Sequence, residues 1–476
     1  MGMTTHSLKF GTSGLRGLAS ELCGKPAYDY TLAFLKAMND RQPIEAKAKV
    51  FVGQDLRPSS PQIAQYCLAA IQDMGFTPVD CGLLPTPALS FYAMRQDAPC
   101  IMITGSHIPD DRNGLKFYRP DGEIDKHDEQ AIAQHYKQIE AGTHAHQLSD
   151  AVKDTKALAA YRDRYLNIFQ KNVFKDLSVG VYQHTSVARD LIIDILQDLG
   201  AKVTALGRAD KFVPVDTEAL RPEDISLLKQ WAGAHSFDLI VSTDGDADRP
   251  LIADENGDFI RGDLLGAITA SWLKSDQIVV PVTANSALDD RFNTSRTKVG
   301  SPYVIQGMEE AIQHGAKSVL GFEANGGVLL GSDVHFEQAT LTALPTRDAL
   351  LPMLACMSQI TALQQPLSAI AAQFEFRHAL SDRLQNVPHE KSGAFIQRLS
   401  KQDASLMEAL KPFGTIQQVD ETDGIRLIFT DGSTLHYRAS GNAPELRCYA
   451  EASDAHHAQH ILQQGLNLAD LETKGV

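Results

Sequence analysis

The stretch LIVSTDGDADR, residues 239–249, joins a short apolar run to three closely spaced carboxylates. The run 239–241 predicts a buried strand, and polar residues at the carboxyl end of such a strand are typical of functional loops in α/β sheets. If the loop is extended, Asp244, Asp246 and Asp248 face the same way because side chains alternate along a strand. Three adjacent carboxylates repel one another unless a hard divalent cation such as Mg²⁺ lies among them. The stretch therefore predicts an α/β fold with a magnesium site at a strand end.

Three other interpretations of this acidic loop compete with a magnesium site. A solvated acidic turn needs no ligand. An EF-hand fits the spacing of Asp244, Asp246, Asp248 and Glu255, but Arg249 stands where that loop needs glycine. An aspartyl-phosphate hydrolase also has its nucleophile in Asp-x-Asp after an apolar strand, but it leaves Asp248 and Arg249 without roles. The metal site explains more of the stretch than the alternatives do.

Apolar runs alternate with amphipathic segments on both sides of this stretch. The pattern predicts strands at 50–52, 100–103, 178–182, 277–282 and 318–320, and helices at 61–74 and 188–199. Such alternation is typical of α/β domains with mostly parallel mixed sheets. Toward the carboxyl end the pattern changes to a hairpin at 425–429 and 434–437, a strand at 446–451 and a helix from Asp454. This last part is predicted to be an α+β unit.

The length and the polar segments between these units predict four domains. A chain of 476 residues exceeds what one hydrophobic core usually serves. We place the boundaries in the His-rich segment 141–150, near 254–262, and in the Gln-rich segment 359–373. The expected domains are three related α/β domains and a C-terminal α+β domain, at residues 1–150, 151–256, 257–372 and 373–476.

The composition excludes several classes of protein. A net charge of -15 argues against nucleic acid as a partner. No apolar stretch reaches the length of a membrane span, and the N-terminus MGMTTHSLKFG has no apolar signal core. The six cysteines are scattered without C-x-x-C spacing, which favours a reducing compartment over a disulfide framework. We therefore expect a cytoplasmic α/β protein without a membrane partner.

A second candidate site is TGSHIP, residues 104–109, directly after the predicted strand 100–103. A hydrolase triad is disfavoured, because adjacent Ser106 and His107 point apart and no G-x-S-x-G elbow is present. A serine that caps a helix in a strand-to-helix turn is one remaining interpretation. The other is a Ser106 that carries a phosphoryl group, with Lys116 as acid/base or charge stabiliser. The motif alone leaves both open.

Three further glycine-containing segments carry polar groups that suit a sugar phosphate. GFEANGG, residues 321–327, offers Glu323 and Asn325 to neighbouring hydroxyls. RASGNAPELR, residues 438–447, offers arginines, a serine and backbone N–H groups to a phosphate. TSGLRG, residues 12–17, places Arg16 between glycines. Each segment alone is also compatible with an ordinary turn.

Taken in this order, the five segments resemble those of the α-D-phosphohexomutase family, and the resemblance runs from Phe10 to about Ala452. It implies four domains around a central cleft. It also implies that Ser106 carries the phosphoryl group and that Mg²⁺ is held by a phosphoserine oxygen with the three aspartates. The other roles that it implies are phosphoryl transfer for Arg16, Lys116 and Arg249, with Lys116 as general acid/base; sugar binding for Glu323, Asn325 and Lys298; and phosphate binding for Arg438, Ser440, Gly441, Asn442 and Arg447.

The reaction expected from this resemblance interconverts hexose 6-phosphate and hexose 1-phosphate through a bisphosphorylated hexose, which also serves as activator. The segment 321–327, which corresponds to the sugar-recognition loop of the family, favours mannose phosphate as substrate, with glucose phosphate as a second substrate. Phosphoglucosamine mutase and, from another class, an aspartyl-phosphate phosphatase are the alternatives. The sequence departs from the family pattern at Ile108, Ala247, Asn325 and Asn442, none of which is the nucleophile or a metal ligand. We expect a monomer or a homodimer.

Overall fold

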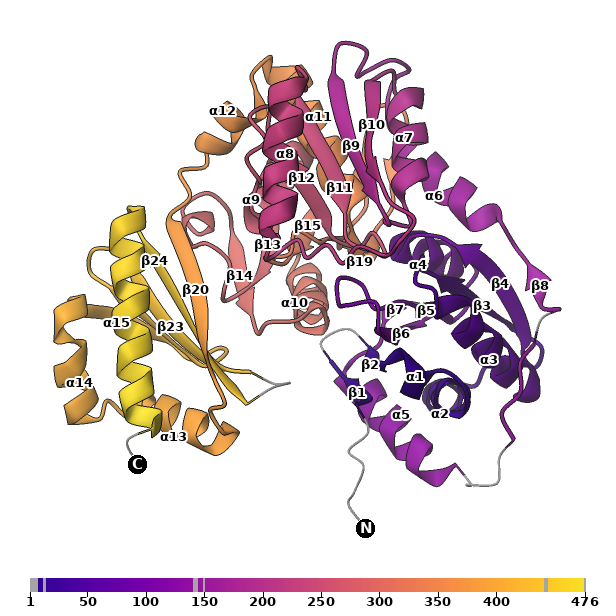
Figure 1. Ribbon diagram of the computed structural model, residues 1–476, viewed down its shortest axis with the longest axis horizontal. Coiled ribbons are helices and arrows are strands. Elements are labelled where there is room, and N and C mark those ends of the chain that lie inside the picture. The colour runs from indigo at the N-terminus through magenta and orange to yellow at the C-terminus, as the bar shows by residue number, and fades with distance from the viewer. Residues whose placement is uncertain (1–6, 12–13, 140–143, 149, 441–443, 475–476) are drawn as a thin grey trace. The chain divides into compact units, whose positions relative to one another are not determined.

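The computed structural model describes residues 7–11, 14–139, 144–148, 150–440 and 444–474. The chain divides into two compact units, Met1–Ile278 with Gly300–Gln373, and Val279–Val299 with Phe374–Val476 (Figure 1). The division falls inside strand β13 (Gln277–Pro281). The domain ends predicted at residues 150, 256 and 372 stay a prediction.

The first sheet of the larger unit positions the Ser106 segment. Among the described residues it has eight strands in the order β1 (Lys9–Phe10), β2 (Leu15–Leu18), β6 (Arg112–Arg119), β5 (Cys100–Ile103), β3 (Lys49–Gln54), β4 (Thr77–Leu83) and β8 (Val152–Lys153), with β7 (Gly122–Glu123) paired to β6. The pairs among β5, β3, β4 and β8 are parallel, whereas β6 pairs antiparallel with both β5 and β2. Helices α1 (Ala19–Leu22), α2 (Lys25–Arg41), α3 (Ser60–Asp73), α4 (Thr86–Met94) and α5 (Lys126–Gln138) accompany this sheet.

The interior of this first sheet is continuous and apolar. All four residues of β5 are buried, so the strand has helices on both of its faces. On one face Phe34 of α2 stacks on Phe117 of β6, with ring centroids 4.8 Å apart. A rigid strand of this kind fixes the loop that leaves its carboxyl end.

The second sheet carries the acidic loop. Its strands run in the order β10 (Lys202–Arg208), β9 (Ser178–His184), β11 (Leu239–Thr243) and β12 (Pro250–Ala253), with β9 parallel to both β10 and β11. Strand β12 returns antiparallel to β11, so the chain reverses between residues 243 and 250. The helices of this part are α6 (Lys156–Leu166), α7 (Arg189–Asp198) and α8 (Pro222–Ala234). The acidic loop is the short connection that makes the reversal.

A third group of strands in the same unit carries the segment 321–327. Strand β15 (Val319–Phe322) pairs antiparallel with β16 (Val328–Leu330), and β16 pairs antiparallel with β19 (Leu344–Asp348). The two-residue strands β17 (Val334–His335) and β18 (Thr340–Leu341) form a separate hairpin. The accompanying helices are α9 (Gly262–Leu273), α10 (Ser301–Gln313), α11 (Leu350–Leu363) and α12 (Leu367–Ala372). The Gln-rich segment predicted as a boundary is thus largely helical.

The smaller unit is an antiparallel sheet with helices packed on it. Its strands run in the order β20 (His378–Gln385), β24 (Glu445–Ala452), β23 (Thr434–Ala439), β22 (Ile425–Phe429) and β21 (Ile416–Asp420). Its helices are α13 (His389–Ser400), α14 (Ala404–Leu410), the 3₁₀ turn Lys411–Phe413 and α15 (Ala455–Lys474), which lies along the sheet in Figure 1. The unit also includes the 3₁₀ turn Ser286–Leu288 and β14 (Thr294–Thr297). The predicted hairpin, last strand and closing helix are confirmed.

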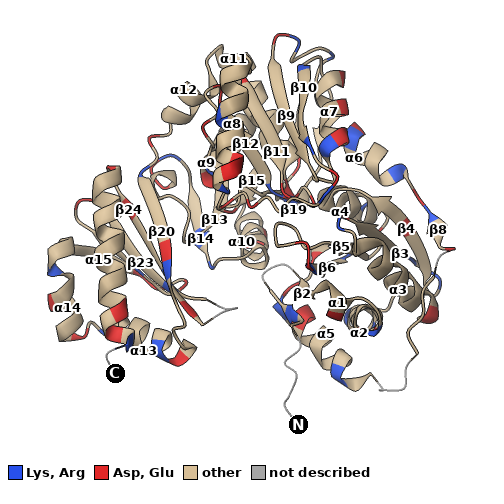
Figure 2. Ribbon diagram, viewed as in Figure 1, with Lys and Arg blue, Asp and Glu red and all other residues tan. Residues whose placement is uncertain are grey.

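Charged residues of both signs are mixed along the helices (Figure 2). Helix α5, for example, carries acidic residues in its first turn and basic residues in its last turn, which complements the helix dipole. In the part of the chain that the structure describes, no helix is both long and apolar enough to cross a bilayer.

Candidate functional site

Ser106 lies in the loop that leaves β5. Thr104 Oγ1 donates to Asp55 Oδ2 at 2.8 Å and accepts the backbone N–H of Ser106 at 2.8 Å. These bonds hold Ser106 in the left-handed region, with φ of 54°. The side chain is buried, and its hydroxyl donates to Asp244 Oδ2. Its Oγ also lies 3.1 Å from His107 Nδ1, so the expectation that Ser106 and His107 point apart is wrong. The chain then enters β6 rather than a helix, so the interpretation of Ser106 as a helix cap is wrong.

The buried side chain of Arg57 holds the Ser106 loop in place. Its two terminal nitrogens donate to the loop carbonyls of Ser106, Ile108 and Pro109 and to that of Arg112, the first residue of β6, at 2.5–3.0 Å. Its Nε lies 3.2 Å from Asp55 Oδ2, and the Phe212 ring stacks 4.1 Å from the guanidinium carbon. The loop backbone is therefore fixed by one cation that the sequence analysis did not identify.

The acidic loop brings its three carboxylates together through a turn. Asp244, Asp246 and Asp248 are fully buried, and one oxygen from each lies within 4.8 Å of the others. The expectation of an extended segment is wrong, because residues 245–249 form turns and bends and Ala247 has φ of 59°. Gly245 is required by a close approach, since a Cβ there would lie 2.7 Å from the Ser106 carbonyl oxygen.

The carboxylates of this cluster repel one another and keep unpaired oxygens, which suits a hard divalent cation. Burial and the charges of Asp246 and Asp248 raise the pKa of Asp244 well above its usual range. Among the described residues, Oδ1 of Asp246 and Oδ1 of Asp248 are buried and accept no hydrogen bond. Carboxylate oxygens are the ligands that Mg²⁺ prefers, and buried acceptors need a partner. The three aspartates therefore fit a metal site.

Lys116 and Thr86 reach the acidic loop from the first sheet. Lys116 Nζ donates to Asp246 Oδ2 at 2.6 Å and to Asp248 Oδ2 at 2.5 Å. Thr86, at the start of α4, donates its hydroxyl to the Asp246 carboxylate and its backbone N–H to the Asp246 carbonyl. These contacts hold the acidic loop against the Ser106 loop.

Three arginines and a neutral histidine lie beside the carboxylates. Burial, Arg249 and Arg347 lower the pKa of Arg16 to about 10, and Arg16 Nη2 is buried without a hydrogen-bond partner among the described residues. Burial, followed by the charge of Arg249, lowers the pKa of His107 to about 2, so its ring is neutral. Arg249 Nη1 lies 3.2 Å from His107 Nδ1, which therefore accepts this hydrogen bond. Converging cations next to Ser106 suit an anionic ligand such as a phosphoryl group.

Glu323 and Asn325, of the segment 321–327, are buried and connected to the acidic loop. Asn325 Oδ1 accepts the backbone N–H of Gly327 at 2.9 Å, and its amide lies 3.4 Å from Glu323 Oε2. Arg347 of β19 donates from Nη1 to Glu323 Oε2 at 3.0 Å and from Nη2 to Asp248 Oδ2 at 3.0 Å. The structure thus brings together Arg16, Ser106, Lys116, Arg249, Glu323, Asn325 and the three aspartates.

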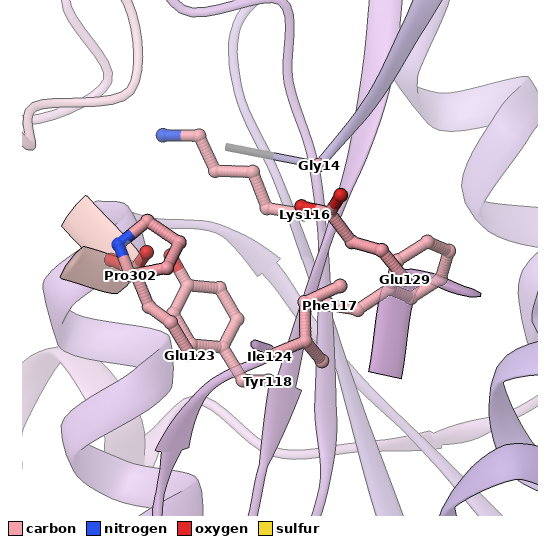
Figure 3. A pocket seen from close by; sticks show the side chains of 8 residues that line it. All are labelled: Gly14, Lys116, Phe117, Tyr118, Glu123, Ile124, Glu129 and Pro302. Atoms are coloured by element: carbon pink, nitrogen blue, oxygen red, sulfur yellow. The ribbon is translucent and has the colours of Figure 1, made fainter. Parts of the chain in front are cut away.

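A small cavity of about 10 Å³ lies behind Lys116 (Figure 3), which is about enough for one water. The Lys116 side chain extends away from the other side chains that line it, in keeping with its contacts to the aspartates. Glu123, on the cavity wall, accepts from Ser301 Oγ at 2.7 Å and from Thr346 Oγ1 at 2.9 Å. Glu123 therefore joins β7 to α10 and to β19.

The remaining predicted site residues belong to the smaller unit. Lys298 is exposed and follows β14, and Ser440 is buried at the end of β23. Gly441 and Asn442 lie outside the described residues. Arg438 pairs across the strands with Arg447, which in turn pairs with Arg383. Three arginines therefore lie side by side on the sheet face opposite the core residues Leu446 and Cys448.

Arg57 and Arg347 are two candidate site residues that the sequence analysis missed. Arg57 follows β3, whose neighbour in the sheet is β5, so polar residues after both strands meet at one edge. Arg347 is a charged residue inside a buried strand, which is rare unless the charge is paired. The position of Arg57 after a strand and the charge of Arg347 inside a strand are both visible in the sequence. Their partners can be inferred only when the order of the strands is known.

Comparison with known proteins identifies the class to which this fold and site belong. Four family models, described as phosphoglucomutase/phosphomannomutase alpha/beta/alpha domains I, II and III and C-terminal domain, match residues 7–143, 159–257, 261–376 and 390–467. The chain belongs to the phosphoglucomutase/phosphomannomutase family. The predictions of the family, of its mixed α/β fold and of an isomerase that transfers a phosphoryl group within one molecule are confirmed.

Two similar relatives share one name. A phosphomannomutase of Sinorhizobium fredii (strain NGR234) is 48% identical over 96% of this chain and 98% of its own length. A phosphomannomutase of Salmonella muenchen is 42% identical over 97% of this chain and 95% of its own length. The crystal structure of a putative phosphomannomutase from Thermus thermophilus has the same fold, with a TM-score of 0.75 at 20% identity, covering 98% of this chain and 99% of that one.

Proposed function

We propose that this protein is a phosphomannomutase that interconverts mannose 6-phosphate and mannose 1-phosphate through a phosphorylated Ser106. The observation that carries the proposal is the hydrogen bond from the Ser106 hydroxyl to Asp244, inside a buried group of three carboxylates and several cations. The names of the two relatives at 48% and 42% identity support mannose phosphate as substrate.

Asp244, Asp246 and Asp248 are the residues that would hold Mg²⁺, together with an oxygen of the Ser106 phosphoryl group. Bound there, Mg²⁺ would supply positive charge against the negative charge of the phosphoryl group. Arg16 and Arg249 add fixed positive charge on the same side, and Arg57 keeps the Ser106 backbone from moving during the transfer. Positioning and electrostatics supply most of the catalysis in phosphoryl transfer.

The transfer breaks the bond between phosphorus and Ser106 Oγ and forms a bond from phosphorus to a hydroxyl oxygen of the hexose monophosphate. The hydroxyl loses its proton and Ser106 Oγ gains one, and we assign this exchange to Lys116, whose Nζ lies at the aspartates. The product is a hexose bisphosphate. When it has turned over, its other phosphoryl group returns to Ser106 with the reverse proton movements.

Glu323 and Asn325 are proposed to hold sugar hydroxyls, with Lys298 as a further sugar contact. Arg438, Ser440 and Arg447, with Gly441 and Asn442, are proposed to hold the phosphate that does not react. Charged hydrogen bonds from arginine suit a phosphate, and the row of arginines on the smaller unit has more positive charge than its neighbouring acids balance. We also propose a cytoplasmic location, because all six cysteines are free thiols.

A substrate panel tests the proposed function. The phosphates of mannose, glucose and glucosamine are assayed with Mg²⁺ and a hexose 1,6-bisphosphate activator, while inorganic phosphate is measured in parallel. We expect the highest kcat/KM with mannose 1-phosphate, lower activity with glucose 1-phosphate and little release of phosphate. A preference for glucosamine phosphate would replace the substrate assignment, and steady phosphate release without isomerisation would favour a phosphatase that uses Asp244.

A further inference from the structure

Arg347 connects the two loops that the proposed function assigns to metal and to sugar. Its Nε and Nη2 donate to Asp248 Oδ2 at 3.1 and 3.0 Å, and its Nη1 donates to Glu323 Oε2 at 3.0 Å. Only 2% of the side chain is exposed. Its methylene carbons pack on Gly327, where an added Cβ would lie 2.5 Å from Arg347 Cδ. One planar guanidinium therefore bridges two buried carboxylates from different sheets.

The neighbours of Arg347 fix its backbone from both sides. Thr346 donates to Glu123, and Asp348 accepts from the hydroxyls of Tyr161 and Tyr165 of α6. Because side chains alternate along a strand, Thr346 and Asp348 face away from Arg347. The anchored residues of β19 thus aim Arg347 at Asp248 and Glu323.

The bonds of Arg347 also decide which oxygen of Asp248 is available. Oδ2 accepts from Lys116 and twice from Arg347, whereas Oδ1 accepts no hydrogen bond among the described residues. Arg249 Nε lies 3.7 Å from Oδ1, beyond hydrogen-bond distance. Oδ1 is therefore left as a buried acceptor for a cation.

We propose that Arg347 is a positioning residue that holds Asp248 and Glu323 at the same time, so that one side chain sets both metal affinity and sugar binding. This proposal rests on the proposed function for the roles of the two loops. The positive charge of Arg347 weakens Mg²⁺ binding, because a cation next to Asp248 offsets part of the attraction of that carboxylate for the metal. The Arg347 guanidinium supports sugar binding, because it fixes the Glu323 carboxylate that would accept sugar hydroxyls. Loss of Arg347 therefore has opposite effects on the two ligands.

The test compares Arg347→Met, Arg347→Lys and a control, Arg119→Met. Arg119 of β6 is also buried, and it pairs with Asp121, Asp125 and Asp128 rather than with the carboxylates that Arg347 bridges. Each purified full-length protein is titrated with Mg²⁺ by calorimetry without substrate, assayed for kcat and KM, and melted to check its folding. The calorimetric titration measures the affinity for Mg²⁺ without relying on turnover.

For Arg347→Met we expect Mg²⁺ to bind at least about threefold more tightly, because the opposing charge is gone. We expect KM for the hexose phosphate to rise about tenfold, because Glu323 loses a charged hydrogen bond. Arg347→Lys keeps the charge, so its Mg²⁺ affinity should stay within about twofold of wild type, but a single ammonium cannot span both carboxylates and KM should remain raised. Arg119→Met should lower the melting temperature and leave both constants unchanged.

Three outcomes would overturn the proposal. Full recovery of KM in Arg347→Lys would show that charge alone matters and that the bridge does not. Unchanged Mg²⁺ affinity and KM in Arg347→Met, with only a lower melting temperature, would make Arg347 purely structural. If Arg347→Met does not fold, the double variant Arg347→Lys with Glu323→Gln is compared with Glu323→Gln alone. A higher KM in the double variant would show that Arg347 does not act through Glu323. If wild type isomerises no hexose phosphate, the proposed function fails, while the Mg²⁺ titration still tests the contact with Asp248.

Discussion

The Ser106–aspartate region of the larger unit and the arginine row of the smaller unit both suit phosphate, but they are built differently. Ser106 and the three aspartates are buried, and buried side chains such as Arg57, Lys116 and Arg347 hold them. Arg383, Arg447 and Arg438 instead lie on a sheet face outside the core, placed by strand register. Buried polar contacts hold reacting groups in fixed positions, as catalysis requires. Strand register is enough to bring several positive charges together, as the binding of a phosphate requires. Changes in the first region should mainly alter kcat, and changes in the second should mainly alter KM.

The largest effect is expected for Ser106→Ala. Removal of the group that carries the phosphoryl should lower kcat by about a thousandfold or more, since only a poor substitute nucleophile remains. Ser242→Ala is the control, because the Ser242 hydroxyl is also buried and donates to the Tyr182 carbonyl at 2.6 Å. It should cost about 1 kcal/mol of stability and little activity. A folded Ser106→Ala protein with near wild-type interconversion would leave Asp244 as the better candidate nucleophile.

Asp244→Asn, Asp246→Asn and Asp248→Asn should each reduce activity at ordinary Mg²⁺ by more than about a hundredfold. Loss of a residue that merely supports a metal ligand costs about 10- to 100-fold in metal affinity, and these residues are proposed as the ligands themselves. Activity is measured against Mg²⁺ concentration, with Asp190→Asn as control because Asp190 pairs with Arg208 at an exposed site. Near-normal activity in any of the three would remove that aspartate from the metal site.

Glu323→Gln tests the sugar contact that is proposed for the larger unit. The variant should lose about ten- to a hundredfold in kcat/KM, because a hydrogen bond to a charged group contributes about 1.5–3 kcal/mol. Phosphorylation of Ser106, read by intact mass, should persist. Glu309→Gln changes an exposed glutamate of α10 and should have no effect. Unchanged kinetics with every hexose phosphate would exclude Glu323 from the sugar site.

Arg447→Met should show the weakest effect of these variants. Its effect should be on KM rather than on kcat, in contrast to changes around Ser106. We expect KM to rise about tenfold with kcat within about threefold, since one charged hydrogen bond to a distant phosphate is lost while the Ser106 region is intact. Arg398→Met, which changes an arginine of α13 paired with Asp403 and Glu472, is the control. A fall in kcat with unchanged KM would contradict the assignment of the arginine row to binding.

Local pattern was enough to predict many elements, because their signals are short-range. The strand predicted at 100–103 is β5 in full, and the helix predicted at 188–199 is α7 (Arg189–Asp198). The turn in the acidic loop was not predicted, because an alanine gives no local signal for the left-handed backbone that Ala247 adopts. Arg57 and Arg347 were missed because Arg57 contacts residues about 50 positions away and Arg347 contacts Asp248, 99 positions away. Periodicity carries no information on such pairs.

The central claim is that Ser106 carries the phosphoryl group, and intact-mass measurement with peptide mapping tests it most directly. Wild-type protein is incubated with a hexose 1,6-bisphosphate and Mg²⁺, freed of ligand, and compared with Ser106→Ala. We predict one phosphoryl group on wild type, located on the peptide that contains Ser106, stable to hydroxylamine and absent from Ser106→Ala. A hydroxylamine-sensitive phosphoryl group on Asp244, or a phosphoryl group that persists in Ser106→Ala, would contradict the account.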